Sequence, residues 1–189
     1  MASILSANGE IDPKRTWDIN IAGLFNSIEV SLTRGATLFH ASTIAVYGGE
    51  NLKRDGTPDN HEKTPDTIYG CTKVASEVVG NYYRSKHGLD YRSLRYPAII
   101  SSEKFQAGGS LSYPQELFYG VNYEGKSEYE IYLLPDTTGP IMHIDDVVQG
   151  TKKFILAPKE KLSQCSYNMN GYAASPRLFV EYLQKRRKQ

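Results

Sequence analysis

The sequence is poor in the features that mark several common classes of protein. Its 189 residues include two cysteines, Cys71 and Cys165, which form no CxxC pair and are too few for a disulfide framework. The 22 lysines and arginines are balanced by 21 aspartates and glutamates, so no excess of cations is present to neutralise nucleic-acid phosphates. No apolar run approaches the roughly 20 residues that a membrane-spanning helix requires. We therefore expect a soluble, intracellular globular protein that binds neither nucleic acid nor membrane.

Metal-binding and export signals are equally sparse. The four histidines are scattered, and none stands at ligand spacing with a cysteine, so no metal site is expected. Met1 is followed by small and apolar residues without a cationic stretch, a pattern typical of neither a secretory signal nor an arginine-rich transit peptide. The informative features are therefore the spacing of apolar residues and the placement of hydroxyls and lysines.

Two segments show apolar residues at helical spacing. The first predicted helix begins near residue 16, with Asp12 or Thr16 as its cap, and ends at Gly35. Its apolar positions are Trp17, Ile21, Leu24, Phe25, Ile28 and Leu32. The second predicted helix covers Ile68 to His87 and ends at Gly88. Its apolar positions are Val74, Ala75, Val78, Val79 and Tyr82.

Strands are predicted between and after these helices. Residues 36–43 form one strand, and residues 90–100 form another that Pro97 interrupts, because proline cannot donate to a sheet ladder. Further along, the pattern predicts helices over 114–124, over 145–157 and from Ser175, with extended segments at 128–134 and 167–169. This alternation favours an α/β fold with a parallel sheet, in which ligands bind beyond the carboxyl ends of the strands.

A tyrosine and a lysine four residues apart lie on the same face of a helix. The ammonium stabilises the phenolate, so it lowers the pKa of the tyrosine and helps the phenol to act as a general base. Two such pairs occur, Tyr69/Lys73 and Tyr82/Lys86. The second lies late in its helix, where Lys86 can interact with the last carbonyls, so a structural role is favoured there. Tyr69 begins its helix just after the loop that follows the first strand, where a site is expected.

Hydroxyl side chains stand at the end of the first strand, at Ser42 and Thr43. Such a hydroxyl can hydrogen-bond a substrate oxygen while a nearby phenolate takes the proton, although a Ser-Thr pair alone is just as often a strand-end cap. Tyr69 and Lys73 downstream, and Arg95-Tyr96-Pro97 after the next strand, make chance a poor explanation for the set.

This combination resembles the extended short-chain dehydrogenase/reductase proteins, the NAD-dependent epimerase/dehydratase group. Within that group it is most similar to the short-chain type of the L-threonine 3-dehydrogenase family. The segments that carry the resemblance are Leu5-Ser6-Ala7, Trp17-Asp18-Ile19-Asn20, Ser42 to Gly48, Thr67 to Gly70, Gly88 to Pro97, Ala98 to Ser101 and Ser166-Tyr167-Asn168. They occur in the family's order over almost the whole chain.

The resemblance implies oxidation of the β-hydroxyl of L-threonine to 2-amino-3-ketobutyrate, a step of threonine catabolism, with hydride passing to NAD+. Tyr69 would be the general base, Lys73 would hold the ribose hydroxyls and lower the pKa of Tyr69, and Thr43 would orient the reacting oxygen. The backbone from Pro97 to Ile99 would meet the nicotinamide amide. Ser6 and Ser110, the latter in the 107–113 loop, would face the amino acid. Asn20 either lies near this relay or is a buried asparagine that kinks its helix.

The resemblance also implies a Rossmann-like doubly wound parallel sheet that lacks its N-terminal part. No G-x-x-G-x-x-G occurs in the sequence, so the turn whose amides meet the pyrophosphate is missing. Residues 1–104 and about 138–157 are expected to form the partial NAD-binding domain, with 105–137 and 158–189 forming a small substrate-binding part. Leu111 and Ser112 replace a hydroxyl and a carboxylate of the family's loop, so recognition of threonine is less firmly implied than the catalytic set.

Two alternatives remain open. One is a nucleotide-sugar epimerase or dehydratase of the same superfamily, which the short C-terminal part disfavours. The other is a non-catalytic, truncated remnant. By analogy with the family, we expect a homodimer formed through the helices at about 16–34 and 69–87. The expected location is mitochondrial for a eukaryotic source and cytoplasmic for a bacterial one.

Overall fold

The computed structural model describes residues 3–49, 56–102 and 112–186. The chain divides into two compact units, one made of residues 1–96 and 149–169 and the other of residues 97–148 and 170–189. Helix α5 (Ile144–Leu156) runs through the boundary between them. Within the described ranges, no helix combines the length and the apolar character needed to cross a membrane.

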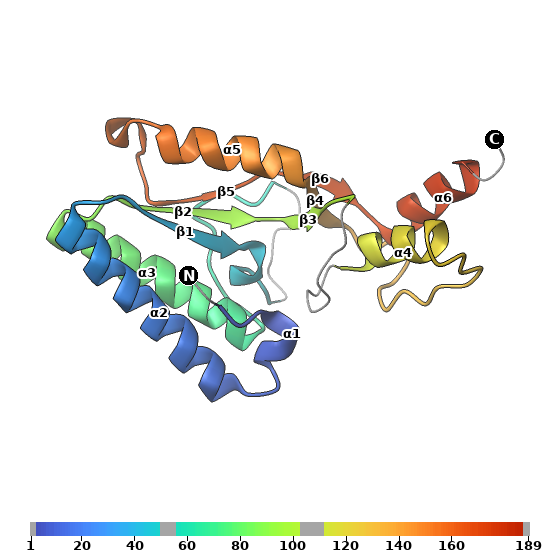
Figure 1. The fold of residues 1–189 in the computed structure, drawn as a ribbon, viewed down its shortest axis with the longest axis horizontal. Helices are drawn as coiled ribbons and strands as arrows, with labels where there is room; N and C mark the ends of the chain where they lie inside the picture. Colours follow the sequence, from blue (N-terminus) through green and yellow to red (C-terminus); the bar gives the residue numbers. More distant parts are fainter. Residues whose placement is uncertain (1–2, 50–55, 103–111, 187–189) are drawn as a thin grey trace. The chain divides into compact units, whose positions relative to one another are not determined.

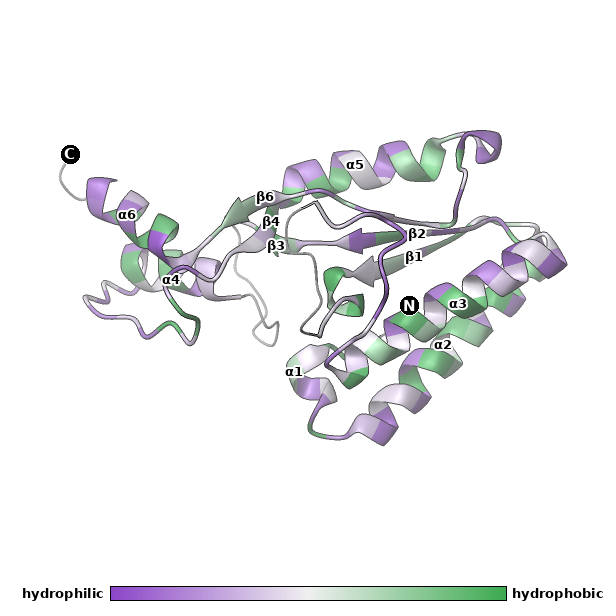
Figure 2. Ribbon diagram, turned by 180° about the vertical axis from the view of Figure 1, so that it is seen from behind, coloured by the Kyte–Doolittle hydropathy of each residue, from purple (hydrophilic) through white to green (hydrophobic). Residues whose placement is uncertain are grey.

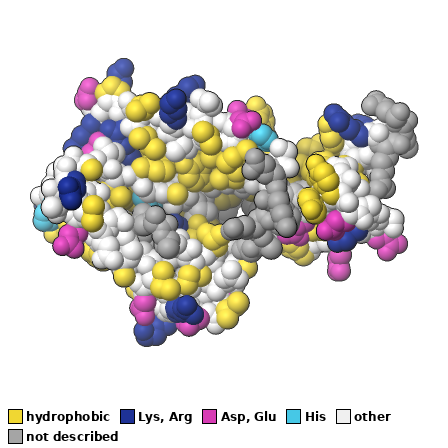
Figure 3. Space-filling model, in the orientation of Figure 1, with side chains coloured by type: hydrophobic (Ala, Val, Ile, Leu, Met, Phe, Trp, Pro, Cys, Tyr) yellow, Lys and Arg dark blue, Asp and Glu magenta, His cyan; other side chains and the backbone are white. Residues whose placement is uncertain are grey.

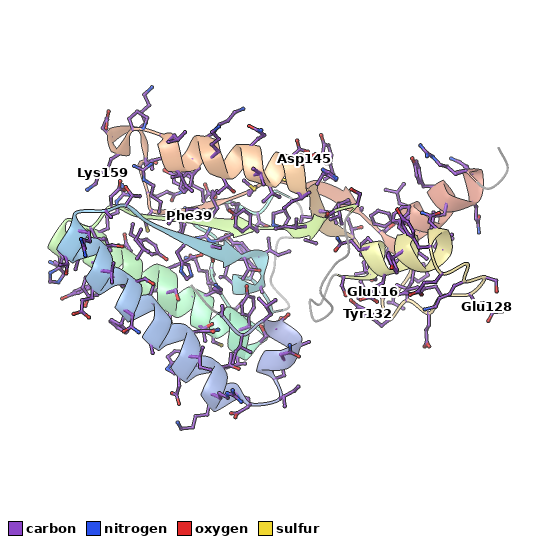
Figure 4. All side chains as sticks on the ribbon, viewed as in Figure 1. Phe39, Glu116, Glu128, Tyr132, Asp145 and Lys159 are labelled. Atoms are coloured by element: carbon purple, nitrogen blue, oxygen red, sulfur yellow. The ribbon has the colours of Figure 1, made fainter. Side chains whose placement is uncertain are left out.

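Unit 1 is a parallel sheet with helices on both of its faces (Figure 1). The sheet has the strand order β1-β2-β5, and Leu38 to Thr43 of β1 stand beside Tyr91 to Tyr96 of β2. Helices α2 and α3 cover one face and the last part of α5 covers the other, where Phe39 meets Phe154 at 6.3 Å between ring centroids (Figure 4). The elements of unit 1 are α1 (Ser6–Gly9), α2 (Pro13–Arg34), β1 (Leu38–Thr43), η1 (Ile44–Val46), α3 (Ile68–His87), β2 (Tyr91–Tyr96), η2 (Lys159–Lys161) and β5 (Ser166–Asn168). The predicted α/β fold with a parallel sheet is confirmed.

Local capping sets the ends of the two long helices. Asp12 accepts a hydrogen bond from the Arg15 amide at the start of α2, and Gly35 ends that helix with a φ of 59°. Thr67 caps α3, and Gly88 ends it with a φ of 72°. These positive φ values suit glycine, which has no Cβ to oppose them. The predicted ends of both helices are confirmed, with Asp12 rather than Thr16 as the cap of α2.

The apolar positions noted in α2 and α3 are divided between the interior and the surface, with Leu24 and Ile28 buried. Trp17 and Phe25 of α2 are 41% and 44% exposed, and Val78 of α3 is 61% exposed. The buried positions are Thr16, Asn20, Leu24, Ile28 and Ser31 in α2, and Gly70, Thr72, Lys73, Ser76, Glu77 and Gly80 in α3. Small residues such as Gly70 and Gly80 allow α3 to approach its neighbours closely. Figure 2 shows apolar residues spread along both helices.

One apolar core cluster fills the part of unit 1 near the start of the strands. It contains Leu24, Ile28, Leu38, Leu89, Tyr91 and Cys165. Here α3 comes so close to β2 that a Cβ on Gly80 would lie 2.3 Å from ring atoms of Tyr91. Glycine at this position therefore permits the helix–sheet packing.

Toward the other end of the strands, the layer between sheet and α3 is polar. Arg95 of β2 binds both carboxylate oxygens of Glu77 at 2.8 Å, and Ser42 of β1 donates to the same carboxylate at 2.7 Å. The remaining Arg95 nitrogen donates to the hydroxyl of Tyr47 at 2.7 Å and to the side-chain oxygen of Asn168 at 3.0 Å. Arg95 is 2% exposed and Glu77 3% exposed, so this buried pair holds α3 to two strands.

Unit 2 has a sheet of strand order β3-β4-β6, in which β4 runs parallel to β3 and antiparallel to β6. Its core contains Tyr113, Leu117, Ala174 and Phe179. Glu116 accepts hydrogen bonds from Ser112 and Tyr129, which ties the segment that follows α4 to that helix; Figure 4 labels Glu116 and the nearby Tyr132. The elements are β3 (Ala98–Ile100), α4 (Tyr113–Asn122), β4 (Gly139–His143), β6 (Tyr172–Ala174) and α6 (Pro176–Arg186).

The unit boundaries differ from the expected domain boundaries. Residues 158–169, expected in the substrate-binding part, belong to unit 1 because β5 pairs with β2. Residues 97–102 and 138–148 belong to unit 2 because β3 pairs with β4. The segment 128–134, expected to be extended, forms no strand, while β4 and β6 were not predicted.

We expect Glu77→Gln to lower the free energy of unfolding by about 3 kcal/mol or more, because it leaves the buried Arg95 charge without its partner. The matched control is Asp18→Asn, which removes the exposed partner of Lys14 (N–O distance 2.7 Å) and should leave stability unchanged within error. Urea unfolding followed by circular dichroism measures both. Equal stability of the two variants would contradict the role assigned to this pair.

Candidate active site

The candidate catalytic residues all lie in unit 1, where β1 ends and α3 begins. Thr43 is the last residue of β1, and its hydroxyl accepts a hydrogen bond from the Ala45 amide at 3.1 Å, which starts the short helix η1. Tyr69 is the second residue of α3. The Thr43 hydroxyl lies near enough to the Tyr69 phenol to counteract part of the rise that burial causes in the Tyr69 pKa.

The first turn of α3 is fixed against its surroundings on several sides. The Thr67 hydroxyl accepts from the Gly70 amide at 3.0 Å, and the Glu10 carboxylate accepts from the Ile68 amide at 2.8 Å. A Cβ on Gly70 would lie 2.3 Å from the carbonyl oxygen of Ala45. Glycine thus allows the close approach of α3 to η1 that brings Tyr69 to Thr43.

Lys73 lies one turn further along α3 on the same face as Tyr69. Its ammonium donates to the carbonyl oxygen of Ala41 at 2.8 Å and lies 5.4 Å from the centroid of the Tyr69 ring. The residue is 7% exposed, and this burial lowers the pKa of Lys73 to about 8. The other two N–H donors of the Lys73 ammonium can bind a polar ligand. With a pKa of about 8, this side chain loses its proton closer to neutral pH than an exposed lysine does.

Burial also acts on Tyr69, and its effect is opposite to the expectation from the sequence. Burial raises the pKa of the Tyr69 phenol, and the Thr43 hydroxyl offsets only part of that rise. The predicted lowering by Lys73 is not seen because the ammonium is directed to the Ala41 carbonyl. Proton transfer from a substrate to Tyr69 therefore depends on further stabilisation of the phenolate.

The Asn20 side chain of α2 forms hydrogen bonds with both the N-terminal segment and α3. Its side-chain oxygen accepts from the Ile4 amide at 2.9 Å, and its side-chain nitrogen donates to the Ile4 carbonyl at 3.2 Å and to the Thr72 hydroxyl at 3.1 Å. These bonds fix the segment that leads into Ser6, the half-buried first residue of α1. Of the two interpretations of Asn20, the buried structural one has direct contacts, and Thr72 links it to the helix of Tyr69.

The remaining predicted site residues lie in unit 2 or outside the described ranges. Pro97 separates β2 from β3, and Ile99 is the middle residue of β3, opposite Met142 of β4. Ser110 and most of the 107–113 loop lie outside the described residues. Tyr82 and Lys86 are exposed near the end of α3, where the Tyr82 ring packs against Tyr83 and His87.

The sequence analysis missed a polar network beside the site. Asp59 accepts from the Asn168 amide at 2.5 Å and from the Gln164 side chain at 2.9 Å, while its own carbonyl accepts from Arg95 at 2.8 Å. Tyr47 joins the network through its hydroxyl. The available signal was the alternation along β2, which places Arg95 on the same face as Tyr91 and so inside the fold.

The charged and metal-ligating side chains of the described residues form no second candidate site. Figure 3 shows basic and acidic side chains interspersed over the visible face. In the ranges 3–49, 56–102 and 112–186, no group of three or more histidine, cysteine, aspartate or glutamate side chains is arranged to hold a metal ion. The candidate site therefore consists of the half-buried Thr43 hydroxyl and Tyr69 phenol and the buried Lys73 ammonium.

The chain is similar to known proteins in sequence and in fold. Residues 4–184 match the model of the NAD dependent epimerase/dehydratase family. The chain is 39% identical over 175 residues to the mitochondrial L-threonine 3-dehydrogenase of Bos taurus, covering 93% of this chain and 46% of that protein. It is 35% identical to an uncharacterised epimerase/dehydratase of Staphylococcus haemolyticus, covering 98% of this chain and 58% of that protein.

A solved structure gives the same result. The crystal structure of L-threonine dehydrogenase from Phytophthora infestans superimposes with a TM-score of 0.93 at 39% identity, covering all of this chain and 60% of that one. The chain thus spans about half the length of the curated relatives it matches.

We expect Gly70→Ala to lower the free energy of unfolding by about 1–3 kcal/mol, because the added Cβ collides with the Ala45 carbonyl. At an unconstrained helical position, the same change would stabilise by about 0.5–1 kcal/mol, so the sign is diagnostic. Val78→Ala, on the exposed side of α3, is the control for helix propensity. Urea unfolding gives both values, and a stabilised Gly70→Ala variant would show that α3 does not need this close approach.

Proposed function

The chain belongs to the NAD dependent epimerase/dehydratase family, and on that premise we propose that it carries the catalytic part of an NAD-dependent L-threonine 3-dehydrogenase. The proposed reaction oxidises L-threonine to 2-amino-3-ketobutyrate, a step of threonine catabolism. The observation that carries the proposal is the placement of the half-buried Thr43 and Tyr69 and the buried Lys73 where β1 ends and α3 begins, with the Lys73 ammonium 5.4 Å from the centroid of the Tyr69 ring. We take L-threonine as the proposed substrate because the names of the bovine and Phytophthora relatives include it.

In the proposed mechanism, Tyr69 accepts the proton of the substrate β-hydroxyl as the general base. Thr43 holds that oxygen through its own hydroxyl. Lys73, whose ammonium lies 5.4 Å from the centroid of the Tyr69 ring, holds the ribose hydroxyls in this proposal, and its charge does not by itself offset the burial that raises the pKa of Tyr69. NAD+, when bound, accepts the hydride from the carbon that bears the hydroxyl.

The residues present fit one end of the cofactor. Tyr69 and Lys73 offer a phenol and an ammonium to the ribose hydroxyls, and the Lys73 ammonium uses one of its three donors on Ala41. We propose Pro97 and Ile99 as the backbone positions for the nicotinamide amide. The 189 residues contain no glycine-rich turn for the pyrophosphate, so tight binding of NAD+ requires chain that this sequence does not supply.

The substrate contacts proposed are Ser6, Thr43, Tyr69 and Ser110. A nucleotide-sugar epimerase or dehydratase is the second candidate, supported by the family name and by the Staphylococcus relative. A non-catalytic remnant is the third, supported by the absence of the glycine-rich turn. For location, we propose mitochondria in a eukaryotic source, by analogy with the bovine relative, and the cytoplasm in a bacterial one.

A homodimer through α2 and α3 is part of the proposal. Both helices expose apolar side chains that unit 1 itself does not bury, with Phe25 44% and Val78 61% exposed. The other exposed apolar residues of these helices are Trp17, Ile19, Val30, Leu32 and Tyr82. Such a set is larger than the single exposed residues usual on a monomer surface.

The function is tested by NADH formation that depends on threonine, measured for this chain and for a form extended at its N-terminus by a glycine-rich nucleotide-binding half. Tyr69→Phe should lower kcat/KM by about 10²–10⁴-fold, as expected for loss of a general base. The matched control is Tyr82→Phe, which alters the other Tyr-x-x-x-Lys pair and should leave kcat/KM unchanged.

Three outcomes decide between the candidates. Equal activity of the Tyr69 and Tyr82 variants would remove Tyr69 from the mechanism. Turnover of a nucleotide-sugar without oxidation of threonine would favour the epimerase or dehydratase. Calorimetry with NAD+ identifies the remnant, which would neither bind the cofactor nor become active when extended.

The dimer is tested by sedimentation. Phe25→Glu places a charge in the exposed apolar face of α2 and should shift the molecular mass from dimer to monomer, because an unpaired charge is costly to bury. Leu156→Glu on α5, at a position 70% exposed, is the control and should leave the mass unchanged. A monomeric unmodified chain, or a dimeric Phe25→Glu variant, would contradict this interface.

A further inference from the structure

Strand β1 forms one edge of the sheet of unit 1 (Figure 1). The strand order is β1-β2-β5, so no strand of the described ranges pairs with β1 on the side away from β2. Proteins usually protect such an edge with lysine, proline or a bulge, because its unpaired amides and carbonyls attract another strand. The six residues of β1 include no lysine, proline or acidic residue, and their register on β2 is continuous. This edge is therefore open to pairing through backbone hydrogen bonds.

The register of β1 on β2 shows which of its backbone groups face this edge. Leu38 stands beside Tyr91, and the Leu38 amide donates to the Asp90 carbonyl at 2.9 Å. In a parallel pair, residues whose amide and carbonyl both bond the neighbouring strand alternate with residues whose amide and carbonyl point away from it. The backbone groups that point away from β2 are therefore those of Phe39, Ala41 and Thr43.

One of these edge groups is bound by the candidate catalytic lysine. The Lys73 ammonium donates to the Ala41 carbonyl at 2.8 Å, so a side chain of α3 stands where the amide of a neighbouring strand would donate. The same ammonium lies 5.4 Å from the centroid of the Tyr69 ring. The edge of the sheet and the candidate active site therefore share one cation.

The described start of the chain lies close to the helical turn that carries this lysine. The Asn20 side chain binds both the amide and the carbonyl of Ile4, and it also donates to the Thr72 hydroxyl at 3.1 Å. Thr72 immediately precedes Lys73 in α3. Chain that precedes Ile4 therefore emerges beside the turn from which Lys73 reaches the edge of β1.

We propose that the edge of β1 is the docking site for a strand that precedes Ile4 in a longer form of this chain, and that this strand takes over the Ala41 carbonyl from Lys73. The position of Ile4 supports this occupant, as do the curated relatives, of whose length this chain spans about half. The two donors compete because both approach the Ala41 carbonyl from the side away from β2. Without the strand, the bond to Ala41 holds the ammonium at the edge. With the strand paired, the ammonium turns to Tyr69 and to the cofactor ribose.

This inference rests on the proposed roles of Tyr69 and Lys73 and adds a regulation of that site. Burial raises the pKa of the Tyr69 phenol, and the charge of Lys73 does not lower it while the ammonium is held by Ala41. An ammonium turned to the phenol favours the phenolate and so lowers its pKa. Pairing at the edge therefore prepares the general base without any change of residue in the site.

Hydrogen exchange measured by NMR tests the pairing, in this chain and in the form extended by a glycine-rich nucleotide-binding half whose last strand ends before Ile4. In this chain, the amides of His40 and Ser42, which face β2, should exchange slowly, and the three edge amides should exchange fast. In the extended form, the amides of Phe39, Ala41 and Thr43 should slow by roughly tenfold or more, because each gains a strand partner. His40 and Ser42 are matched controls within the same strand.

NMR of ¹³C-labelled tyrosine tests the release of Lys73, with Tyr69→Phe to assign the signal. In the extended form, Lys73→Met should raise the pKa of Tyr69 by about one unit or more, because it removes a charge that faces the phenol. In this chain, the same substitution should change that pKa by less than about 0.3 units. Lys86→Met, in the other Tyr-x-x-x-Lys pair, is the matched control and should leave the pKa of Tyr69 unchanged in both forms.

A third measurement needs only this chain and serves if the extended form does not fold. Lys73→Met should shift the carbonyl ¹³C resonance of Ala41, which loses its donor, and should leave that of Phe39, also at the edge, unchanged. An unshifted Ala41 resonance overturns the proposal.

Three other outcomes overturn it as well. The first is a folded extended form whose edge amides stay unprotected, and the second is an equal effect of Lys73→Met on the Tyr69 pKa in both forms. The third is protection of the edge amides in this chain that is lost on dilution, because a second copy would then occupy the edge. These readouts need neither NAD+ nor turnover, so their failure is distinct from failure of the dehydrogenase assay.

Discussion

The buried pair of Arg95 and Glu77 is the constraint on which the rest of unit 1 depends. Its two parallel hydrogen bonds of 2.8 Å join β2 to α3, and Ser42 adds β1 to the same carboxylate. A charged pair so deeply buried is tolerated only when nearly all its donors and acceptors are used, and the other contacts of Arg95 meet that condition. The pair therefore fixes how α3 lies along the sheet, and with it the position of Lys73 one turn away.

The layer between α3 and the sheet is polar, and this polarity allows Lys73 to be buried. Burying its ammonium against apolar side chains would cost much free energy, whereas neighbouring backbone dipoles and hydroxyls lower that cost. The apolar core is displaced toward the start of the strands, where Tyr91 closes against Gly80. One half of α3 thus packs on the apolar core, and the other holds the buried ionisable groups Lys73 and Glu77.

Features set by a few neighbouring residues could be predicted from the sequence, whereas features set by contacts between distant segments could not. The ends of α3 follow from Thr67 and Gly88, because capping and a positive φ are properties of one or two residues. The motif containing Tyr69 and Lys73 could be found because its spacing is fixed by one helical turn. The burial of Glu77 could not be predicted, since its partner Arg95 lies on a strand that the pattern places only as extended. The rise in the Tyr69 pKa likewise depends on burial, which only the packed structure supplies.

The residues proposed to transfer the proton are held in place within unit 1. Thr43, Tyr69 and Lys73 are all held by contacts within unit 1, through η1, the cap of α3 and the Ala41 carbonyl. None of these contacts uses a residue of unit 2. Ser112, which departs from the family's loop, lies in unit 2, where it donates to Glu116. A substitution of Ser112 is therefore not expected to displace Thr43, Tyr69 or Lys73.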